Sequence, residues 1–405
     1  MKKGQSEVHA ETRSSRREPN PPPSALSAPP REKQFGWQIK TLGEVCDVIN
    51  GGTPKTNVPE YWDGNHRWIT PAEMGKRLSP YVSDTERKIT DLGLRDSSAR
   101  MLPPNSVILS SRAPIGHLVI NTEPTGTNQG CKGLIPCSQI ETKFLYYHLG
   151  SIVDLLNSLG TGATFKELSG GKLKEVTIPV PPLDEQQRIV GLLDEAFEGL
   201  ATAKANAEKN LQNARALFES HLQSVFTQRG VGWVEKPFKE CIEDVKYTTK
   251  IQRKEFLEEG EFPIVSQEAD FTNGYWDNAA DVFKVTRPVV IFGDHTQVLK
   301  YIDFDFVLGA DGVKLLPPKP FLNPKFFFYA LRSAPLKSLG YARHYRLLKE
   351  LQIGYPDTHA QVAIAKKLDA IENETQRLAR LYEQKLASLE ALKKSLLQQA
   401  FSGQL

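Results

Sequence analysis

The clearest chemical signal in the sequence is a run of cations that has no acidic partners. Residues 312–349 contain no Asp or Glu, and aromatic residues alternate with cations in the second half, GYARHYRLLK. Unopposed cations bind phosphate oxygens, and Arg can also donate two hydrogen bonds to a guanine edge. The run favours nucleic acid as a ligand over a merely solvated basic face. Its cations are Lys314, Lys319, Lys325, Arg332, Lys337, Arg343, Arg346 and Lys349.

The first half of the chain offers polar side chains on loops of defined shape. In GGTPKTNVPEYWDGNHRWIT, residues 51–70, glycines and prolines favour a fixed loop, and we expect Trp62 and Trp68 to anchor it. SSRAP and TNQGCKG follow or precede apolar runs, and Asn and Gln amides suit adenine edges. Ordinary turn chemistry is the alternative for any single residue. The candidate DNA contacts in this half are Lys55, Thr56, Asn57, Arg67, Arg112, Asn128, Gln129, Lys132 and Lys166.

The second half presents different residues at matching places. FGDHTQ and GADGVK align with SSRAP and TNQGCKG, and the basic run follows them. Similar scaffolds with different loop residues are what two different half-sites would require. The candidate DNA contacts here are His295, Thr296, Gln297, Lys314, Arg343, His344 and Arg346.

Sequence motifs for catalysis or metal binding are missing. There is no GxxxxGK(S/T), GxSxG or HExxH pattern, and the eight histidines are dispersed. A structural role is the expectation for His117, His148 and His344, and His344 is also a candidate DNA contact because it lies in the basic run. The absence of these motifs points to binding rather than catalysis, and the sequence offers no candidate metal site.

Composition limits the class of protein. The net charge of +3 arises in residues 1–33, and the remaining residues carry 44 cations and 44 anions. Overall charge therefore gives no argument for DNA, and only its local distribution does. Four scattered cysteines without a CxxC pair suit a reducing compartment. We expect a cytoplasmic protein without a secretory signal or a membrane span.

A repeated unit organises the chain. IPVPPLDEQQRIVGLLDEAF begins at Ile178, and IGYPDTHAQVAIAKKLDAIE begins 175 residues later, with Gln186, Ile189 and Asp194 recurring as Gln361, Ile364 and Asp369. FLYYHLGS recurs as FFFYALRS at an offset of 182, and WQIKTLGEV recurs as WVEKPFKEC at 196. Several blocks keep the same order, which indicates a tandem duplication of a globular-plus-helix unit.

The two helical segments, residues 184–227 and 358–405, lack proline and have apolar or small residues at helical spacing. A seven-residue repeat from Leu193 gives one seam of mostly small residues and, 175 residues later, one of mostly large residues. Complementary volumes favour packing of the two helices on each other. The predicted interface residues are Leu193, Leu200, Leu217, Leu368, Ile371, Leu378, Leu389 and Leu392.

These patterns predict an α+β fold with an internal pseudo-twofold duplication. Two mixed α/β domains are expected to be joined by two long antiparallel, coiled-coil-like helices. The expected order is a disordered tail (1–33), a first domain (34–183), a central helix (184–227), a second domain (228–357) and a C-terminal helix (358–405).

From residue 35 onward, the chain resembles the specificity (S) subunit of type I restriction-modification systems. The resemblance rests on GGTPKTNVPEYWDGNHRWITPAEM, TNQGCKGL, IPVPPLDEQQRI and LKKSLLQQAFSGQL, which occur in the expected order. The second helix start, YPDTHAQ, keeps Pro356 and Gln361 but lacks the second proline and the Glu of the first. This departure concerns the second helix junction.

The resemblance implies a non-catalytic subunit that binds a split, asymmetric double-stranded DNA sequence. Residues 34–183 and 228–357 would be target-recognition domains 1 and 2, one for each half, and residues 184–227 and 358–405 would be the spacer helices that set the gap. It implies two methyltransferase (modification) subunits, which use AdoMet to methylate adenine N6, and restriction subunits, the motor-nucleases of an ATP-dependent endonuclease. AdoMet, ATP and Mg are expected on these partners and none on this chain. Two other functions stay open: a coiled-coil scaffold without DNA readout, and the recognition subunit of a system with a fused methylase-nuclease. A third open alternative is that the chain is itself an enzyme.

Overall fold

The computed structural model describes residues 36–112, 114–162, 166–309, 312–340 and 342–405. The predicted disordered tail, residues 1–33, lies outside them. The chain divides into two compact units, which are described separately. The first contains the described residues up to Glu198 together with Leu392–Leu405, and the second contains Gly199–Ala391.

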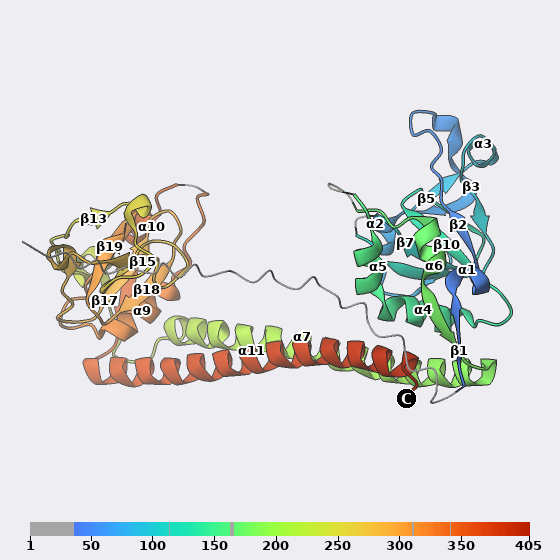
Figure 1. The fold of residues 1–405 in the computed structure, drawn as a ribbon. Coiled ribbons are helices and arrows are strands. Elements are labelled where there is room, and N and C mark those ends of the chain that lie inside the picture. The colour runs from blue at the N-terminus through green and yellow to red at the C-terminus, as the bar shows by residue number, and fades with distance from the viewer. Residues whose placement is uncertain (1–35, 113, 163–165, 310–311, 341) are drawn as a thin grey trace, which may run out of the picture. The chain divides into compact units, whose positions relative to one another are not determined.

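Three sheets make up the strands of the first unit (Figure 1). Apolar runs such as VILS in β7 are buried along their whole length, because the central strand is covered on both faces. The five-stranded sheet has the order β2 (Cys46–Asn50), β10 (Cys131–Pro136), β7 (Val107–Ser110), β8 (Leu118–Asn121) and β4 (Tyr81–Val82). The four-stranded sheet has the order β5 (Arg87–Ile89), β3 (Trp62–Ile69), β9 (Thr125–Thr127) and β6 (Met101–Leu102). The two-stranded sheet pairs β1 (Gln38–Thr41) with β11 (Thr177–Val180).

Short helices complete the first unit. The sequence pattern predicts one helix over residues 142–159, but the structure has α4 (Thr142–Ser151) and α5 (Val153–Leu159), since the backbone at Ile152 leaves the helical region at φ −112° and ψ 19°. Ser169 caps α6, in which two glycines follow the cap. The remaining elements are α1 (Leu42–Val45), η1 (Pro59–Tyr61), α2 (Pro71–Met74), α3 (Asp91–Arg95) and α6 (Gly170–Glu175).

The second unit repeats part of this plan around the sheet β18 (Leu299–Ile302), β17 (Val289–Gly293) and β20 (Val313–Leu316). A second sheet has the order β13 (Lys250–Ile251), β19 (Phe306–Gly309), β14 (Phe262–Val265) and β15 (Gly274–Trp276), and β16 (Val282–Phe283) also pairs with β19. A two-stranded sheet pairs β12 (Val234–Pro237) with β21 (Gln352–Tyr355). The helices are α8 (Phe238–Cys241), η2 (Arg253–Glu255), η3 (Ala279–Asp281), α9 (Pro324–Arg332) and α10 (Tyr345–Leu348).

The predicted duplication is confirmed strand by strand. Antiparallel β1–β11 corresponds to β12–β21, and β10–β7–β8 corresponds to β20–β17–β18 with the same central strand. Helix α4 corresponds to α9, whose buried aromatic side chains pack into the core of their unit. The two cores are therefore built from corresponding elements.

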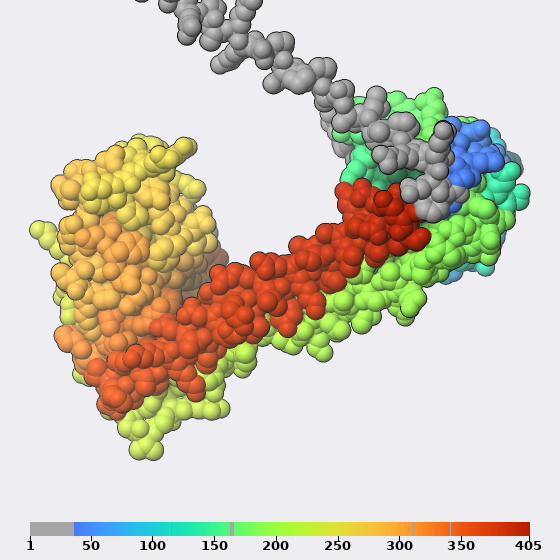
Figure 2. Space-filling model, turned by 60° about the horizontal axis from the view of Figure 1, so that its bottom comes forward, coloured from blue at the N-terminus to red at the C-terminus, as the bar shows by residue number. Residues whose placement is uncertain are grey.

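The two long helices are α7 (Leu183–Thr227) and α11 (Thr358–Phe401), close to the predicted ranges. In the second unit α11 lies beside α7 (Figures 1 and 2), with Lys204 bonded to Glu390 and Arg215 to Glu383 at 2.7 and 2.8 Å. The numbers rise on one helix as they fall on the other, so the pair is antiparallel. In the first unit, Arg188 near the start of α7 donates to the carbonyl of Leu405, just after the end of α11, at 2.8 Å, which agrees with an antiparallel arrangement.

The predicted helix seam needs a correction in its later part. Leu193 and Leu368 are buried, and Leu200, Ile371, Leu378 and Leu389 are half-buried. Leu217 and Leu392, however, are 56% and 47% exposed, whereas Phe218 and Leu397 are buried. An α-helix has 3.6 residues per turn, so a strict seven-residue repeat drifts by about 20° per heptad away from the buried face. The prediction that Leu217 and Leu392 lie in the seam is wrong.

His148 of α4 makes the stability of the first unit depend on pH. Its Nε2–H donates to the Thr177 carbonyl at 3.0 Å, and burial lowers its pKa to about 4. Between that value and the unfolded value of about 6.5, the unfolded chain binds more protons, so stability falls as pH decreases through this window. We expect the free energy of unfolding to fall by about 2 kcal/mol between pH 7 and pH 5 from this group. Denaturant unfolding at both pH values measures it, and an unchanged pH dependence in His148→Leu would contradict it.

Candidate nucleic-acid interface

The loop after β2 in the first unit is held by close backbone contacts. A Cβ on Gly51 would lie 1.8 Å from the Asn128 carbonyl oxygen, and one on Gly52 would lie 2.3 Å from the Ser98 carbonyl carbon, so both positions need glycine. The two tryptophans anchor the loop as predicted: Trp68 Nε1 donates to the Gly52 carbonyl at 2.9 Å and Trp62 Nε1 to the Lys55 carbonyl at 3.2 Å. The exposed residues of the loop are Lys55, Thr56 and Asn57.

The turn between β9 and β10 lies against this loop. Asn128 Oδ1 accepts the Gly130 N–H at 3.0 Å, which fixes the turn, and the Thr53 hydroxyl donates to Gln129 Oε1. Gln129 is exposed and Asn128 is half-buried. The two predicted segments, residues 51–57 and 128–130, therefore form one surface.

An ion pair joins the end of β7 to the segment before α6. Arg112 Nη2 lies 2.9 Å from Glu167 Oε2, and Ser111 accepts the Leu168 N–H through its carbonyl at 2.9 Å. Arg112 and Lys166 are exposed. Glu167 was missed by the sequence analysis, and only its position next to a candidate cation could have indicated it. The ion pair with Glu167 holds the guanidinium of Arg112 at the surface of the unit.

Lys132 is a correction to the predicted contacts. Its side chain is only 6% exposed, Nζ lies 4.0 Å from Glu167 Oε1, and burial lowers its pKa. The residue lies on β10, a strand inside the sheet between β2 and β7. The prediction that Lys132 contacts DNA is therefore wrong, and we assign it a supporting position beneath Glu167.

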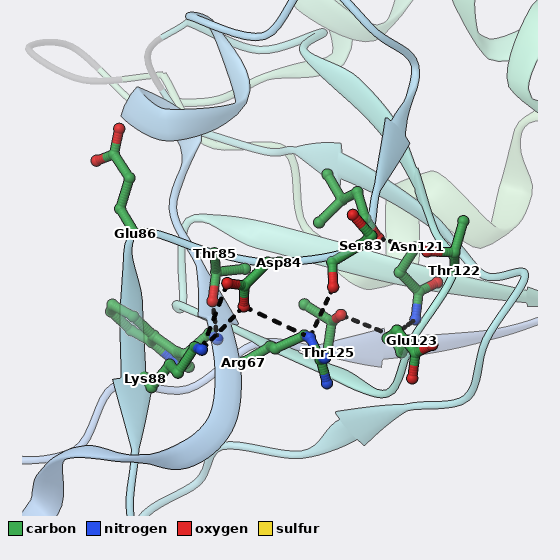
Figure 3. Close-up of polar contacts among 12 residues, drawn as sticks. Arg67, Ser83, Asp84, Thr85, Glu86, Lys88, Asn121, Thr122, Glu123 and Thr125 are labelled. Atoms are coloured by element: carbon green, nitrogen blue, oxygen red, sulfur yellow. Dashed lines mark hydrogen bonds and ion pairs between the residues drawn. The ribbon is translucent and has the colours of Figure 1, made fainter.

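Arg67 belongs to a separate polar network on β3 (Figure 3). Its Nε donates to the Ser83 carbonyl at 2.7 Å and lies 3.6 Å from Asp84 Oδ1. Asp84 also pairs with Lys88 at 3.0 Å, and the hydrogen bond from Lys88 lowers the pKa of this carboxyl. Arg67 is half-buried and has a structural role here, so it is a weaker candidate than Arg112.

Asp294 organises the corresponding edge of the second unit. Its N–H donates to the Gly312 carbonyl, its carbonyl accepts the His344 N–H and Oδ1 accepts the Tyr345 N–H, all at 2.7 Å. Lys314 Nζ lies 3.9 Å from its other carboxylate oxygen. The loop after β17, the start of β20 and the basic segment before α10 therefore meet at one buried carboxylate. Asp311, singled out in GADGVK, lies outside the described residues.

His344 is a second correction. It is 1% exposed, its Nδ1 lies 3.0 Å from the Asp294 carbonyl, and its Nε2 accepts the Leu339 N–H at 2.9 Å. Both ring nitrogens have partners inside the unit, so the prediction that His344 contacts DNA is wrong. It positions the backbone between Arg343 and Arg346, both of which are exposed.

The hairpin loop from β17 to β18 carries the other candidates. Gln297 has φ of 60°, a left-handed conformation that its N–H bond to the Gly293 carbonyl at 2.8 Å stabilises. The Thr296 hydroxyl donates to the Gln267 carbonyl at 2.5 Å, and the His295 N–H donates to Gln267 Oε1 at 3.2 Å. Thr296 is exposed and the other two are half-buried.

The basic run divides into two groups. Lys325 pairs with Asp369 at 3.2 Å, and Arg332 pairs with Glu219 and Glu372, so these two cations have partners on α7 and α11 and are not free for phosphate. Lys314 and Lys349 lie over the Tyr345 ring at 5.4 and 5.0 Å. Within the described part of the basic run, five cations have no acidic partner: Lys319, Lys337, Arg343, Arg346 and Lys349.

The two units present different chemistry at corresponding edges. Arg112 and Asp294 occupy matching positions at the ends of β7 and β17, and each forms an ion pair, Arg112 with Glu167 before α6 and Asp294 with Lys314 on β20. Arg donates hydrogen bonds and Asp accepts them, so the two equivalent positions have opposite hydrogen-bonding character. Within the described ranges, no three His, Cys, Asp or Glu side chains are grouped to hold a metal ion, and no helix is long and apolar enough to cross a bilayer.

Comparison with known proteins finds one family. The model of the type I restriction modification DNA specificity domain matches residues 35–211 and 230–388. The chain is 36% identical over 187 residues to the type I restriction enzyme MjaIX specificity subunit of Methanocaldococcus jannaschii, covering 45% of this chain and 43% of the relative. It is 36% identical over 171 residues to the EcoR124I/EcoR124II specificity subunit of Escherichia coli, covering 40% and 41%. The chain thus spans less than half the length of each of these two relatives.

Solved structures match over more of the chain. A chain from a structure of the type I R-M system has a TM-score of 0.74 at 20% identity and covers 91% of this chain and 98% of its own length. The HsdS subunit of Thermoanaerobacter tengcongensis has a TM-score of 0.59 at 20% identity, covering 91% and 97%. These matches confirm the fold class predicted from the sequence.

Proposed function

Since the chain belongs to the type I restriction-modification DNA specificity family and carries two of that family's domains, we propose that it binds a bipartite, asymmetric double-stranded DNA site. Each unit reads one half, and the number of unread base pairs between the halves depends on the helices. Specificity subunits are non-catalytic in this family, and we assign the same role to this chain.

One observation carries the proposal: the same strand edge occurs twice with different side chains. In the first unit, the exposed groups are Arg112, Gln129 and the loop of residues 55–57. In the second, they are Thr296, Arg343 and Arg346 around buried Asp294. Base edges in the major groove present distinct donor and acceptor patterns, so different side chains on equal scaffolds select different sequences.

The proposed partners supply the chemistry. Two methyltransferase subunits would bind AdoMet and methylate adenine N6, and restriction subunits would use ATP and Mg. The helices are the proposed docking region, and in the second unit Leu217 and Leu381 offer exposed apolar area on them. We place the complex in the cytoplasm, where its DNA is.

Reconstitution tests this assignment of roles. The purified chain should neither methylate nor cleave DNA, and adding the modification subunit with AdoMet should give sequence-specific methylation. Methylation by the chain with AdoMet alone would contradict a non-catalytic role.

The exposed arginines before α10 give a measurable electrostatic prediction. Arg343→Ala or Arg346→Ala should weaken DNA binding and reduce the slope of log K against log salt by about 1, because one phosphate contact is lost. Fluorescence anisotropy of the assembled complex at several salt concentrations measures the slope. Arg377→Ala is the matched control, since Arg377 is exposed on α11 and pairs with Glu374 at 2.7 Å. Slopes in the Arg343 and Arg346 variants equal to wild type would contradict a phosphate contact.

A further inference from the structure

Each unit connects its short core helix to the start of a long helix through a buried glutamine. Gln186 of α7 accepts the Glu141 N–H through Oε1 at 2.9 Å, and its Nε2 donates to the Gln139 and Pro181 carbonyls at 2.8 and 2.9 Å. Glu141 is the N-cap residue of α4. The glutamine thus ties the first turn of α7 to the first turn of α4.

The second unit repeats these three bonds residue for residue. Gln361 of α11 accepts the Asn323 N–H at 2.7 Å and donates to the Phe321 and Pro356 carbonyls at 3.0 and 2.9 Å. Asn323 is the N-cap residue of α9. Both glutamines are fully buried, so the loss of either would leave backbone groups unsatisfied in the interior.

A second tie lies about two helical turns further along each long helix. In the first unit, Asp194 accepts the Tyr147 hydroxyl at Oδ1 and pairs with Lys143 at 2.6 Å through Oδ2. In the second unit, Asp369 lies 2.6 Å from the Tyr329 hydroxyl and 3.2 Å from Lys325 Nζ. Tyr and Lys come from α4 or α9, and Asp comes from α7 or α11 in both cases.

The apolar residues of each long helix pack in the core of its unit, and two polar ties along the helix restrict its direction further than one tie does. The buried amide sets where the long helix starts, and the tyrosine–aspartate bond sets the angle at which it crosses the short helix. The tyrosine hydroxyls are suited to this because burial, followed by the bonds to the carboxylates, raises the pKa of Tyr147 and Tyr329. Both therefore remain neutral donors at physiological pH.

The second joint carries one further tie. The Tyr329 hydroxyl also lies 2.8 Å from Glu372 Oε2, and Arg332 connects Glu372 of α11 to Glu219 of α7. Gly150 occupies the position of Arg332 in the first copy. The second joint is therefore the more strongly constrained of the two.

We propose that Tyr147 with Asp194, and Tyr329 with Asp369, are positioning contacts that fix the angle between each recognition domain and its long helix, and through it the accepted DNA spacer length. The inference rests on the proposed function, because it assumes that spacer length matters. Without the hydroxyl, the angle is held less tightly, by the glutamine tie, the Lys–Asp pair and the apolar packing alone, and half-sites at a neighbouring spacing are accepted more readily.

The test uses Tyr147→Phe, Tyr329→Phe and the double variant in complex with the methyltransferase subunits. Synthetic duplexes carry the two half-sites with the native spacer or one base pair more or less, and methylation rates are measured on each. We expect the ratio of the native-spacer rate to the altered-spacer rate to fall about tenfold in each single variant, as expected for one hydrogen bond to a charged group. The ratio is taken within one preparation, so a lower folded fraction cancels.

Tyr146→Phe is the matched control. Tyr146 is adjacent to Tyr147, its hydroxyl makes no hydrogen bond among the described residues, and the second copy has Phe328 at this position. It should keep the wild-type ratio. If the wild-type complex discriminates between spacers and every Tyr147 and Tyr329 variant keeps the wild-type ratio of native-spacer to altered-spacer rates, the inference is overturned. A wild-type complex that ignores spacer length would instead overturn the proposed function.

Discussion

Removing one heptad from each long helix, residues 201–207 and 387–393, should shorten the DNA spacer by about three base pairs and leave both half-sites unchanged. Seven helical residues span about 10.5 Å, and successive phosphates on a B-DNA strand advance about 3.4 Å along the axis. The deleted segments are centred on Lys204 and Glu390, which pair at 2.7 Å. Mapping methylated adenines in cells that carry the deletion measures the spacer.

The design preserves the buried face of both helices. A heptad is close to two turns, so Ala214 takes the place of Ala207 on α7, and both are buried alanines. Deleting the heptad from α7 alone is the control, and it should cost stability because the facing residues of α11 then lose their partners. A double deletion that folds and still methylates only at the original spacing would contradict a spacer set by helix length.

Exchanging residues 51–132 for the corresponding segment of a relative with another target should replace one half of the methylated sequence and leave the other half intact. The segment contains the glycine loop and the turn at Asn128, which form one surface, and Arg112, whose neighbour Ser111 donates its N–H to the Gly130 carbonyl of that turn at 2.7 Å. Its buried residues belong to the core of that unit, so the second unit should be unaffected. The expected effect on the original site is complete loss of methylation.

The reciprocal exchange of residues 293–346 is the matched experiment. It replaces the edge around Asp294 and should change only the other half of the site. A scaffold without DNA readout predicts the original methylated sequence after either exchange. That outcome, in a complex that still methylates, would contradict direct reading by these surfaces.

The architecture was predictable because its signals are local or repeated. Helical spacing without proline predicted the α7 and α11 ranges to within a residue at their starts. The duplication followed from blocks such as FLYYHLGS and FFFYALRS, which became α4 and α9. Such patterns depend on neighbouring residues along the chain.

The individual contacts were less predictable because they depend on tertiary packing. Lys132 is buried on an inner strand beside Glu167, and the ring of His344 is buried with partners at Asp294 and Leu339. Lys325 and Arg332 look like free cations in sequence, but their acidic partners lie on the long helices. The roles of the exposed candidates in DNA binding stay predictions.

The repeat contained one signal from which the joints between the domains and the long helices could have been predicted. Gln186 and Asp194 recur as Gln361 and Asp369, and Tyr147 recurs as Tyr329 at the offset of the neighbouring block. The structure brings these recurring residues together in two equal joints. Polar residues that recur in both copies therefore indicated shared architecture, whereas residues that differ between the copies, such as Arg112 and Asp294, indicated the surfaces that distinguish two half-sites.

The most direct test of the account is a map of N6-methyladenine across the host genome, with and without the gene for this chain. We predict one asymmetric motif of two short halves separated by a fixed number of unspecified base pairs, methylated in the wild type and unmethylated in the deletion strain. A motif that stays methylated without the gene, or a dependent motif that is continuous with no gap, would contradict reading of a split site by two recognition domains.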